Sequence, residues 1–308
     1  MSLPATIRIG VRSTKLALAI AHEVREALQQ AHPSLAIELV MLGDGDHVHD
    51  GGVARGGFTD ELDKALKDGR IDAALHDLSD LPAVRPDSFA LAAVPKRRHP
   101  FDVLLTLDGR ILDELESGER IGASTASRRA QMLAYREDLE VVAAPGNLDS
   151  HRKQLEDGAY HGLVMSAADA ERLGWHDRVS EIFTTEVCVP SPGQGAIALE
   201  VLASRKDVIS AVKGLDDKAC RQAVIAERAW LNELGGDGDD LPAGALANVV
   251  DDQLVIEAVV VSADGMEVVR DEIEGPVGSA EMLGTKLAVR MLERGAREIV
   301  EAPVDGAD

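Results

Sequence analysis

Residues 7–30 read IRIGVRSTKLALAIAHEVREALQQ, and their hydrophobic period changes at Arg12-Ser-Thr14. Residues 7–11 alternate apolar side chains with others, which is typical of a strand, whereas apolar residues from about Thr14 to Gln30 recur at helical spacing. The order continues with a strand at 36–42, a helix at 61–67 and a short buried strand at 71–76. Strands that alternate with helices predict a parallel sheet with helices on both faces.

The same rhythm restarts after residue 100. Strands are expected at 102–107, 120–123, 139–143 and 162–166, with helices at 127–135 and 149–156. The segments PKRRHP at 95–100 and SPGQG at 191–195 are typical of connections, so the chain is expected to cross between two lobes there. We therefore predict an α/β protein with two periplasmic-binding-protein-like lobes around a hinged cleft.

The last third of the chain has a different pattern. A helix at 223–234 is followed by a hairpin of two strands, 254–261 and 266–273, and by a final helix at 280–294. This order predicts a small α+β domain. A chain of 308 residues is long for one core. We expect a first lobe of 1–98 with 197–215, a second lobe of 102–194, and a C-terminal domain of 218–303.

Acidic residues outnumber basic ones, 54 against 32, for a formal charge of −22. A nucleic-acid duplex or an anionic membrane would repel such a surface, so neither is expected as a partner. Aromatic residues make up only 3% of the chain, which also disfavours stacking on single strands. The excess acid leaves two alternatives open: a solubility adaptation, for example to salt, and a cationic partner.

The sequence predicts a cytoplasmic protein, because it has no signal-peptide pattern and no apolar run of the ~18 residues that a membrane span needs. Its two cysteines, Cys188 and Cys220, form no metal-binding spacing and are expected to be small buried residues. His47 and His49 lie in an acidic segment, where an exposed polar loop is favoured over a metal centre. We predict no metal site.

Polar residues follow several predicted strands. Ligands of open α/β sheets bind at the carboxyl ends of the strands, where helix N-termini favour anions. Such turns hold Arg12-Ser-Thr14, Ser124 to Arg129 and Gly146-Asn147. The sequence therefore predicts a cleft for a poly-anionic ligand.

Seven motifs stand in order along the chain: IGVRSTKLAL at 9–18, HDLSDLP at 76–82, STASRR at 124–129, GN at 146–147, PSPGQG at 190–195, AERA at 226–229 and GAREIV at 295–300. Together they resemble the motifs of the hydroxymethylbilane synthase (porphobilinogen deaminase) family. The resemblance spans nearly the whole chain. It supports the fold more strongly than the activity.

The resemblance implies a transferase that condenses four porphobilinogen molecules, small anionic pyrroles, into linear hydroxymethylbilane with loss of ammonia. It implies a dipyrromethane cofactor, thioether-linked to a cysteine of the third domain. We also expect the protein to be a monomer. Asp80 matches the aspartate that assists each step; an N-cap before Leu81-Pro82 is the alternative. The matching anion-binding and hydroxyl residues are Arg12, Arg128, Arg129, Thr14 and Thr125, with Arg55 loosely matching a loop lysine.

The chain departs from the family pattern at the cofactor cysteine. The corresponding segment, 234–244, reads LGGDGDDLPAG, and Asp237 cannot form a comparable thioether. Other family residues are also replaced: a lysine by Ser79, a serine by Asp77, and two arginines by Pro145 and His151, with Arg152 adjacent and able to compensate. The loop at 51–58 is shorter than the family's lid.

These departures leave two functions open. The first is a hydroxymethylbilane synthase that holds its primer in an unusual way. The second is a catalytically lapsed homologue that binds a poly-carboxylate or pyrrole ligand in the cleft without turnover. Turnover of porphobilinogen, or a covalent adduct, would discriminate between them.

Overall fold

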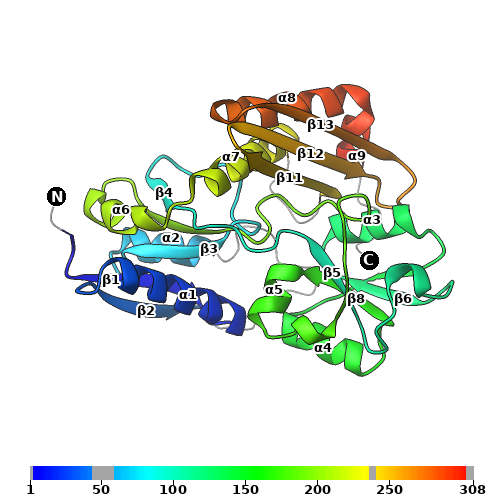
Figure 1. Cartoon of the computed structure of the whole chain (residues 1–308), viewed down its shortest axis with the longest axis horizontal. Coiled ribbons are helices and arrows are strands. Elements are labelled where there is room, and N and C mark those ends of the chain that lie inside the picture. Colours follow the sequence, from blue (N-terminus) through cyan, green and yellow to red (C-terminus); the bar gives the residue numbers. More distant parts are fainter. Residues whose placement is uncertain (1–2, 44–58, 236–240, 303–308) are drawn as a thin grey trace.

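The computed structural model describes residues 3–43, 59–235 and 241–302. They form two α/β lobes side by side and a C-terminal domain that lies across both (Figure 1). This confirms the predicted fold class of two α/β lobes with a small α+β domain. The exact domain boundaries given above stay a prediction.

The first lobe is a five-stranded sheet in the order β2-β1-β3-β10-β4. Its strands are β1 (Thr6–Arg12), β2 (Ala36–Leu42), β3 (Ala73–Asp77), β4 (Phe89–Ala93) and β10 (Ile197–Leu202), and its helices are α1 (Lys15–Ala31), α2 (Thr59–Lys67) and α6 (Lys206–Val212). Ile7, Ile9 and Val11 of β1 are fully buried between α1 and the sheet core.

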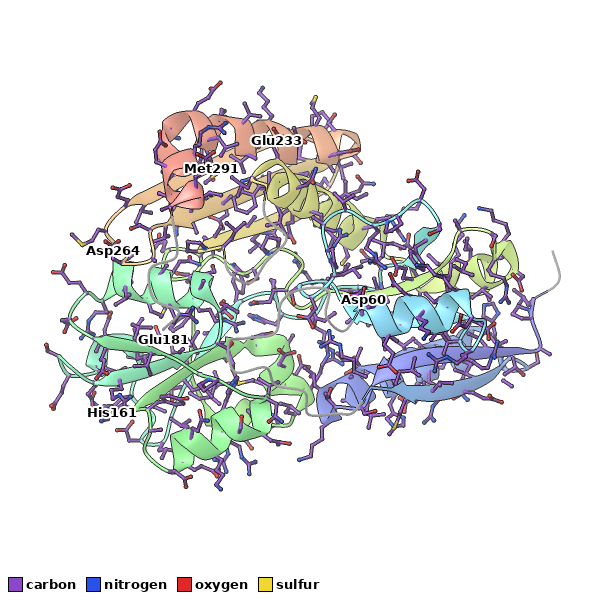
Figure 2. All side chains as sticks on the ribbon, turned by 180° about the vertical axis from the view of Figure 1, so that it is seen from behind. Asp60, His161, Glu181, Glu233, Asp264 and Met291 are labelled. Atoms are coloured by element: carbon purple, nitrogen blue, oxygen red, sulfur yellow. The ribbon has the colours of Figure 1, made fainter. Side chains whose placement is uncertain are left out.

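The second lobe repeats this arrangement in the order β7-β6-β8-β5-β9. It consists of β5 (Asp102–Thr106), β6 (Arg120–Ala123), β7 (Glu140–Ala143), β8 (Gly162–Ser166) and β9 (Val179–Ile182), with α3 (Ala126–Tyr135), α4 (Leu148–Glu156) and α5 (Ala167–Arg172). Figure 2 shows the side chains of this lobe from behind and labels Glu181 of β9 and His161, which precedes β8.

The prediction of parallel sheets was wrong. Both sheets are mixed, because β10 runs antiparallel to β3 and β4, and β5 runs antiparallel to β8 and β9. Each of these two strands begins just after the chain has crossed from the other lobe. It therefore enters its sheet from the side of the crossing and runs opposite to its two neighbours in the sheet.

The two crossings pass between β4 and β5 and between β9 and β10, where the Pro/Gly-rich segments lie. The second crossing approaches the first lobe closely. Gly193 has a φ of +83°, and a Cβ there would lie 2.9 Å from the carbonyl carbon of Leu78. Only glycine fits this approach without a shift of the backbone.

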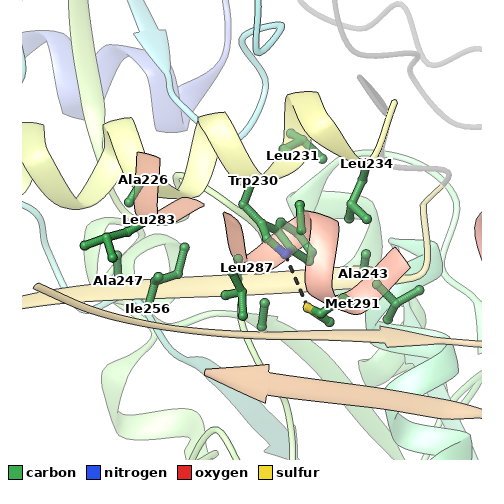
Figure 3. Packing of buried hydrophobic residues seen from close by; sticks show 14 of the residues in the cluster. Ala226, Trp230, Leu231, Leu234, Ala243, Ala247, Ile256, Leu283, Leu287 and Met291 are labelled. Carbon is green, nitrogen blue, oxygen red and sulfur yellow. Dashed lines mark hydrogen bonds between the residues drawn. The ribbon is translucent and has the colours of Figure 1, made fainter. Parts of the chain in front are cut away.

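The C-terminal domain packs α7 (Lys218–Glu233) and α8 (Ala280–Met291) on a three-stranded antiparallel sheet of β11 (Ala243–Val250), β12 (Gln253–Val261) and β13 (Val268–Pro276). Trp230 is fully buried at its centre and donates its indole N–H to Met291 Sδ at 3.4 Å (Figure 3). The predicted hairpin is present, but β11 was not predicted. The helix predicted at 280–294 is α8, which ends at Met291. A π-type turn at Leu292–Ala296 then connects it to α9 (Arg297–Glu301).

A buried carboxylate joins the C-terminal domain to both crossings. Glu227 of α7 is fully buried and accepts two hydrogen bonds from the Arg97 guanidinium, at 2.6 and 2.7 Å. It also accepts from the backbone N–H groups of Gly193, at 2.7 Å, and Ala247, at 2.8 Å. One side chain thus holds the first crossing, the second crossing and β11 together.

The next residue, Arg228, holds the loop after β3. Its guanidinium donates to the carbonyl oxygens of Leu81, Pro82 and Ala83 at 3.0, 2.5 and 2.9 Å. The AERA motif therefore fixes the backbone that immediately follows Asp80.

Within the described ranges, no helix has the length and apolar character that a membrane crossing requires.

Candidate functional site

A cavity of about 530 Å³ lies between the two lobes. Its walls come from the ends of strands in both sheets and from the second crossing. The first lobe contributes residues 12–16 after β1 and 77–80 after β3, and the second lobe contributes residues after β6, β7 and β8. The lining includes Arg12, Thr14, Asp80, Thr125 and Arg128, so the structure brings together five of the seven predicted site residues.

Four helices begin at this cavity, each with a side chain that caps it. Thr14 caps α1 by accepting from the Ala17 N–H at 3.1 Å, and Thr125 caps α3 by accepting from the Arg128 N–H at 3.2 Å. Asn147 and Ser166 cap α4 and α5 in the same way. The two threonine hydroxyls, predicted as ligand contacts, use their oxygen as caps and keep their O–H to donate.

Asp80 does not cap a helix, because residues 81–88 contain none. Its carboxylate forms an ion pair with the guanidinium of Arg12, across the cavity floor between β1 and β3. The Asp80 side chain is 41% exposed, so it can also meet a ligand. The N-cap alternative for Asp80 is therefore wrong.

Arg128 is more enclosed than the sequence suggested. Its guanidinium contacts Asp102, which is fully buried, at 2.8 Å and Gln194 Oε1 at 3.0 Å. A third contact goes to Ser124 Oγ at 3.1 Å. Arg128 therefore links α3 to β5 and to the second crossing, in addition to lining the cavity.

Arg129 and Arg152 are not part of the described lining. Arg129 is half-buried and donates to the Ala123 carbonyl at 3.4 Å. Arg152 lies 5.7 Å from the centre of the Trp175 ring and 3.4 Å from Glu156. The compensation predicted for Arg152 therefore finds no support in its position. Arg55, the loop at 51–58, His47, His49 and Asp237 lie outside the described residues.

Five titratable residues of the lining were not predicted as site residues: Lys15, Asp149, Asp77, Asp169 and His151, and the pKa values of the last three are shifted. Burial and the charge of Asp80 raise the pKa of Asp77, although its Oδ1 accepts from Ser79 N and Oγ at 3.0 and 2.8 Å. Burial and the charge of Asp77 raise the pKa of Asp169 to about 7. Burial lowers the pKa of His151, so its ring is neutral at neutral pH.

The sequence held a signal for two of the three residues whose pKa values are shifted. Asp77 and His151 replace a serine and an arginine of the family pattern, and both replacements were read only as losses. Asp169 stands three residues into a helix and has no motif to mark it.

The described lining has fewer unpaired positive charges than the strand-to-helix turns in the sequence predicted. It contains Arg12, Lys15 and Arg128, and each pairs with an aspartate: Asp80, Asp149 at 2.7 Å and Asp102. The Lys15–Asp149 pair joins the first lobe to the second at the rim, where it is exposed and contributes little. The capped helix N-termini are therefore the groups of the described lining that favour anions without a carboxylate partner.

Neither cysteine reaches the cavity. Cys188 and Cys220 are buried, as predicted, and burial raises the pKa of both thiols, that of Cys220 to about 11. Among the described residues, no group of three His, Cys, Asp or Glu side chains could hold a metal ion.

Comparison with known proteins covers nearly the whole chain. Residues 7–210 match the family model "Porphobilinogen deaminase, dipyromethane cofactor binding domain", and residues 221–293 match "Porphobilinogen deaminase, C-terminal domain". The chain is 38% identical over 300 residues to the porphobilinogen deaminase of Pelotomaculum thermopropionicum, with 96% of each chain covered. It is 38% identical to that of Roseiflexus sp., with 96% of this chain and 98% of the relative covered.

Solved structures with similar lobes include the Bordetella pertussis BvgS VFT2 domain and the methionine binding protein MetQ. The first is 16% identical with a TM-score of 0.43, covering 68% of this chain and 85% of the other. The second is 14% identical with a TM-score of 0.43, covering 73% and 94%.

Proposed function

The chain belongs to the porphobilinogen deaminase family, and from this we propose how its own residues serve the family's reaction. The family and its full-length relatives assign the chain porphobilinogen deaminase function in tetrapyrrole biosynthesis. The observation that carries the assignment is similarity along both lobes and the C-terminal domain, with Asp80 in the cavity between the lobes.

We propose that Asp80 is the catalytic residue. Ammonia leaves a pyrrole more readily when the amine is protonated, and the carbon left behind carries positive charge. A carboxylate held close to that carbon stabilises the charge as it develops. Arg12 orients the Asp80 carboxylate from one side, and Arg228 fixes the backbone that follows it.

The substrate's acetate and propionate groups are proposed to bind Arg12, Arg128 and the helix N-termini capped by Thr14 and Thr125. Guanidinium groups suit carboxylates because two N–H donors match two oxygens. Arg12 and Arg128 already contact aspartates, so a substrate carboxylate joins these pairs rather than meeting a free cation.

The residues present fit the carboxylates of a dipyrromethane, but they do not fit its thioether link. The sequence has two cysteines, both are buried, and neither lines the cavity. The segment 234–244, where the family has its cysteine, contains none. We propose that this chain lacks the covalent attachment, and that any dipyrromethane is held by ion pairs and hydrogen bonds alone.

The missing thiol favours a second candidate: a lapsed homologue that binds a pyrrole or poly-carboxylate without turnover. In either case we propose a monomer that meets a small anionic pyrrole in the cytoplasm, as the family suggests.

Intact-protein mass spectrometry before and after incubation with porphobilinogen tests the proposal, together with an assay of bilane formation. We expect turnover with an unmodified protein mass. A mass above that of the chain, in pyrrole increments, would show that another residue carries the cofactor and would overturn the noncovalent proposal. An unmodified mass without turnover would favour the lapsed homologue.

A further inference from the structure

Two buried polar atoms of the described cavity lining have no hydrogen-bond partner. Each Arg and Lys of the described lining already faces a carboxylate. By contrast, Asp169 Oδ1 and His151 Nε2 are buried and have no hydrogen-bond partner among the described residues. An unpaired buried acceptor costs free energy unless a ligand supplies a donor.

His151 presents a lone pair rather than a proton. The side chain is 4% exposed, and burial keeps the ring neutral by lowering its pKa. The carbonyl groups of residues 144–146 act in the opposite direction and favour a proton on the ring nitrogen that faces them. That nitrogen is Nδ1, because Nε2 has no partner, so the neutral ring leaves Nε2 as an acceptor.

Asp77 and Asp169 line the cavity from different lobes, and the charge of Asp77 contributes to the raised pKa of Asp169. Asp77 ends β3 of the first lobe, and Asp169 lies in α5 of the second. Arg172 forms an ion pair with Asp169, but its Nη1 is 3.9 Å from Oδ1, too far for a hydrogen bond. Two carboxyl groups in this part of the cavity, with an Asp169 oxygen that receives no hydrogen bond, favour a cationic group of a ligand.

We propose that Asp77, Asp169 and His151 form a subsite for a protonated primary amine. An ammonium group has three N–H donors and no acceptor, which matches two carboxylates and one imidazole nitrogen. The proposal rests on the proposed function, because the porphobilinogen amine that is lost as ammonia is such a group. The subsite holds the nitrogen, while Asp80 faces the carbon from which it departs.

The test compares porphobilinogen with an analogue that carries methyl in place of aminomethyl and keeps both carboxylates. In Asp169→Asn we expect the KM for porphobilinogen to rise on the order of tenfold to a hundredfold, because a charge-assisted contact is lost. The inhibition constant of the methyl analogue should stay unchanged. The matched control is Asp157→Asn, an exposed acid at the end of α4, for which both constants should stay the same.

A parallel loss of both affinities in Asp169→Asn, or no change in either, would overturn the subsite. If the chain proves unable to turn over porphobilinogen, calorimetric dissociation constants of the same two ligands make the same comparison. Failure of the proposed function and failure of the subsite are therefore separate results.

A second arm distinguishes the substrate's amine from released ammonium ion. Ammonium chloride is compared with sodium chloride at equal ionic strength, on the wild type and on Asp169→Asn. Stronger inhibition by ammonium, lost in the variant, supports a subsite that also retains the product. Equal inhibition by both salts would support a subsite for the bound substrate alone, provided that Asp169→Asn still weakens binding of porphobilinogen and not of the methyl analogue.

Discussion

Replacing Asp169 by asparagine should stabilise the protein at alkaline pH. The pKa of this carboxyl is raised from its ordinary 3.8 to about 7, first by burial and then by the charge of Asp77. At a pH above the pKa that Asp169 has in the unfolded chain, the unfolded chain loses this proton freely. The folded protein must either keep the proton or bury a charge, and both cost free energy relative to the unfolded chain. Stability is therefore lost as pH rises from about 4 to about 7, and the loss is complete above that.

The size of the effect follows from the same values. A rise from 3.8 to about 7 corresponds to at most about 4 kcal/mol, at 1.36 kcal/mol per pH unit. The side chain is 20% exposed, and asparagine also gives up the attraction of Arg172. We expect Asp169→Asn to raise the free energy of unfolding by about 2 kcal/mol at pH 8, and by much less near pH 5.

Urea unfolding followed by circular dichroism at pH 5, 6, 7 and 8 measures this difference. The gain of the variant over wild type should grow with pH and level off above 7. The control Asp157→Asn should give no pH-dependent difference, because its carboxyl is exposed. A gain that is equal at pH 5 and pH 8, or a loss at pH 8, would refute the reasoning about burial.

Three further changes probe other parts of the structure. Asp80→Asn should stop bilane formation with an unchanged circular dichroism spectrum, and full residual activity would contradict the catalytic role of Asp80. Gly284→Ala should destabilise the protein by about 1–3 kcal/mol in urea, because the new Cβ would lie 2.1 Å from a carbonyl oxygen of α7; Gly278→Ala, with open space around it, should have no effect. Glu227→Gln should cost about 3–5 kcal/mol, since it leaves the Arg97 guanidinium buried without its charge partner; a cost below about 1 kcal/mol would show that the pair is dispensable.

Local patterns in the sequence predicted most of the elements in the two lobes. Residues 36–42, 120–123 and 162–166 form strands with the predicted bounds, because their apolar side chains fill the cores of the two lobes. The directions of β5 and β10 could not be predicted in this way. They depend on where the chain re-enters each sheet after a crossing, which is a property of the whole fold.

The strand β11 was missed for a related reason. Its sequence, AGALANVV, is rich in small residues and lacks the β-branched run that marks a strand. It is a strand because it pairs with β12 and packs under α7, so tertiary contacts decide its conformation.

The candidate site was predicted where motifs marked it and missed where burial created it. Asp80, Arg12 and Arg128 stand in motifs, and all three line the cavity. Asp169 has no motif, and its raised pKa arises from the opposite lobe and from enclosure. A sequence does not display which side chains meet across two lobes.

The hydrogen bonds of Glu227 to Arg97, Gly193 and Ala247 imply that the two lobes and the C-terminal domain cannot be prepared as separate stable fragments. The boundary between the two family models, residues 211–220, invites a cut that would yield two fragments. Such a cut would leave Arg97 in one fragment and Glu227 in the other, and each fragment would expose to water a surface that the intact protein buries. The fragments should fail as independent units and should regain structure when mixed, because each supplies the counter-charge that the other requires.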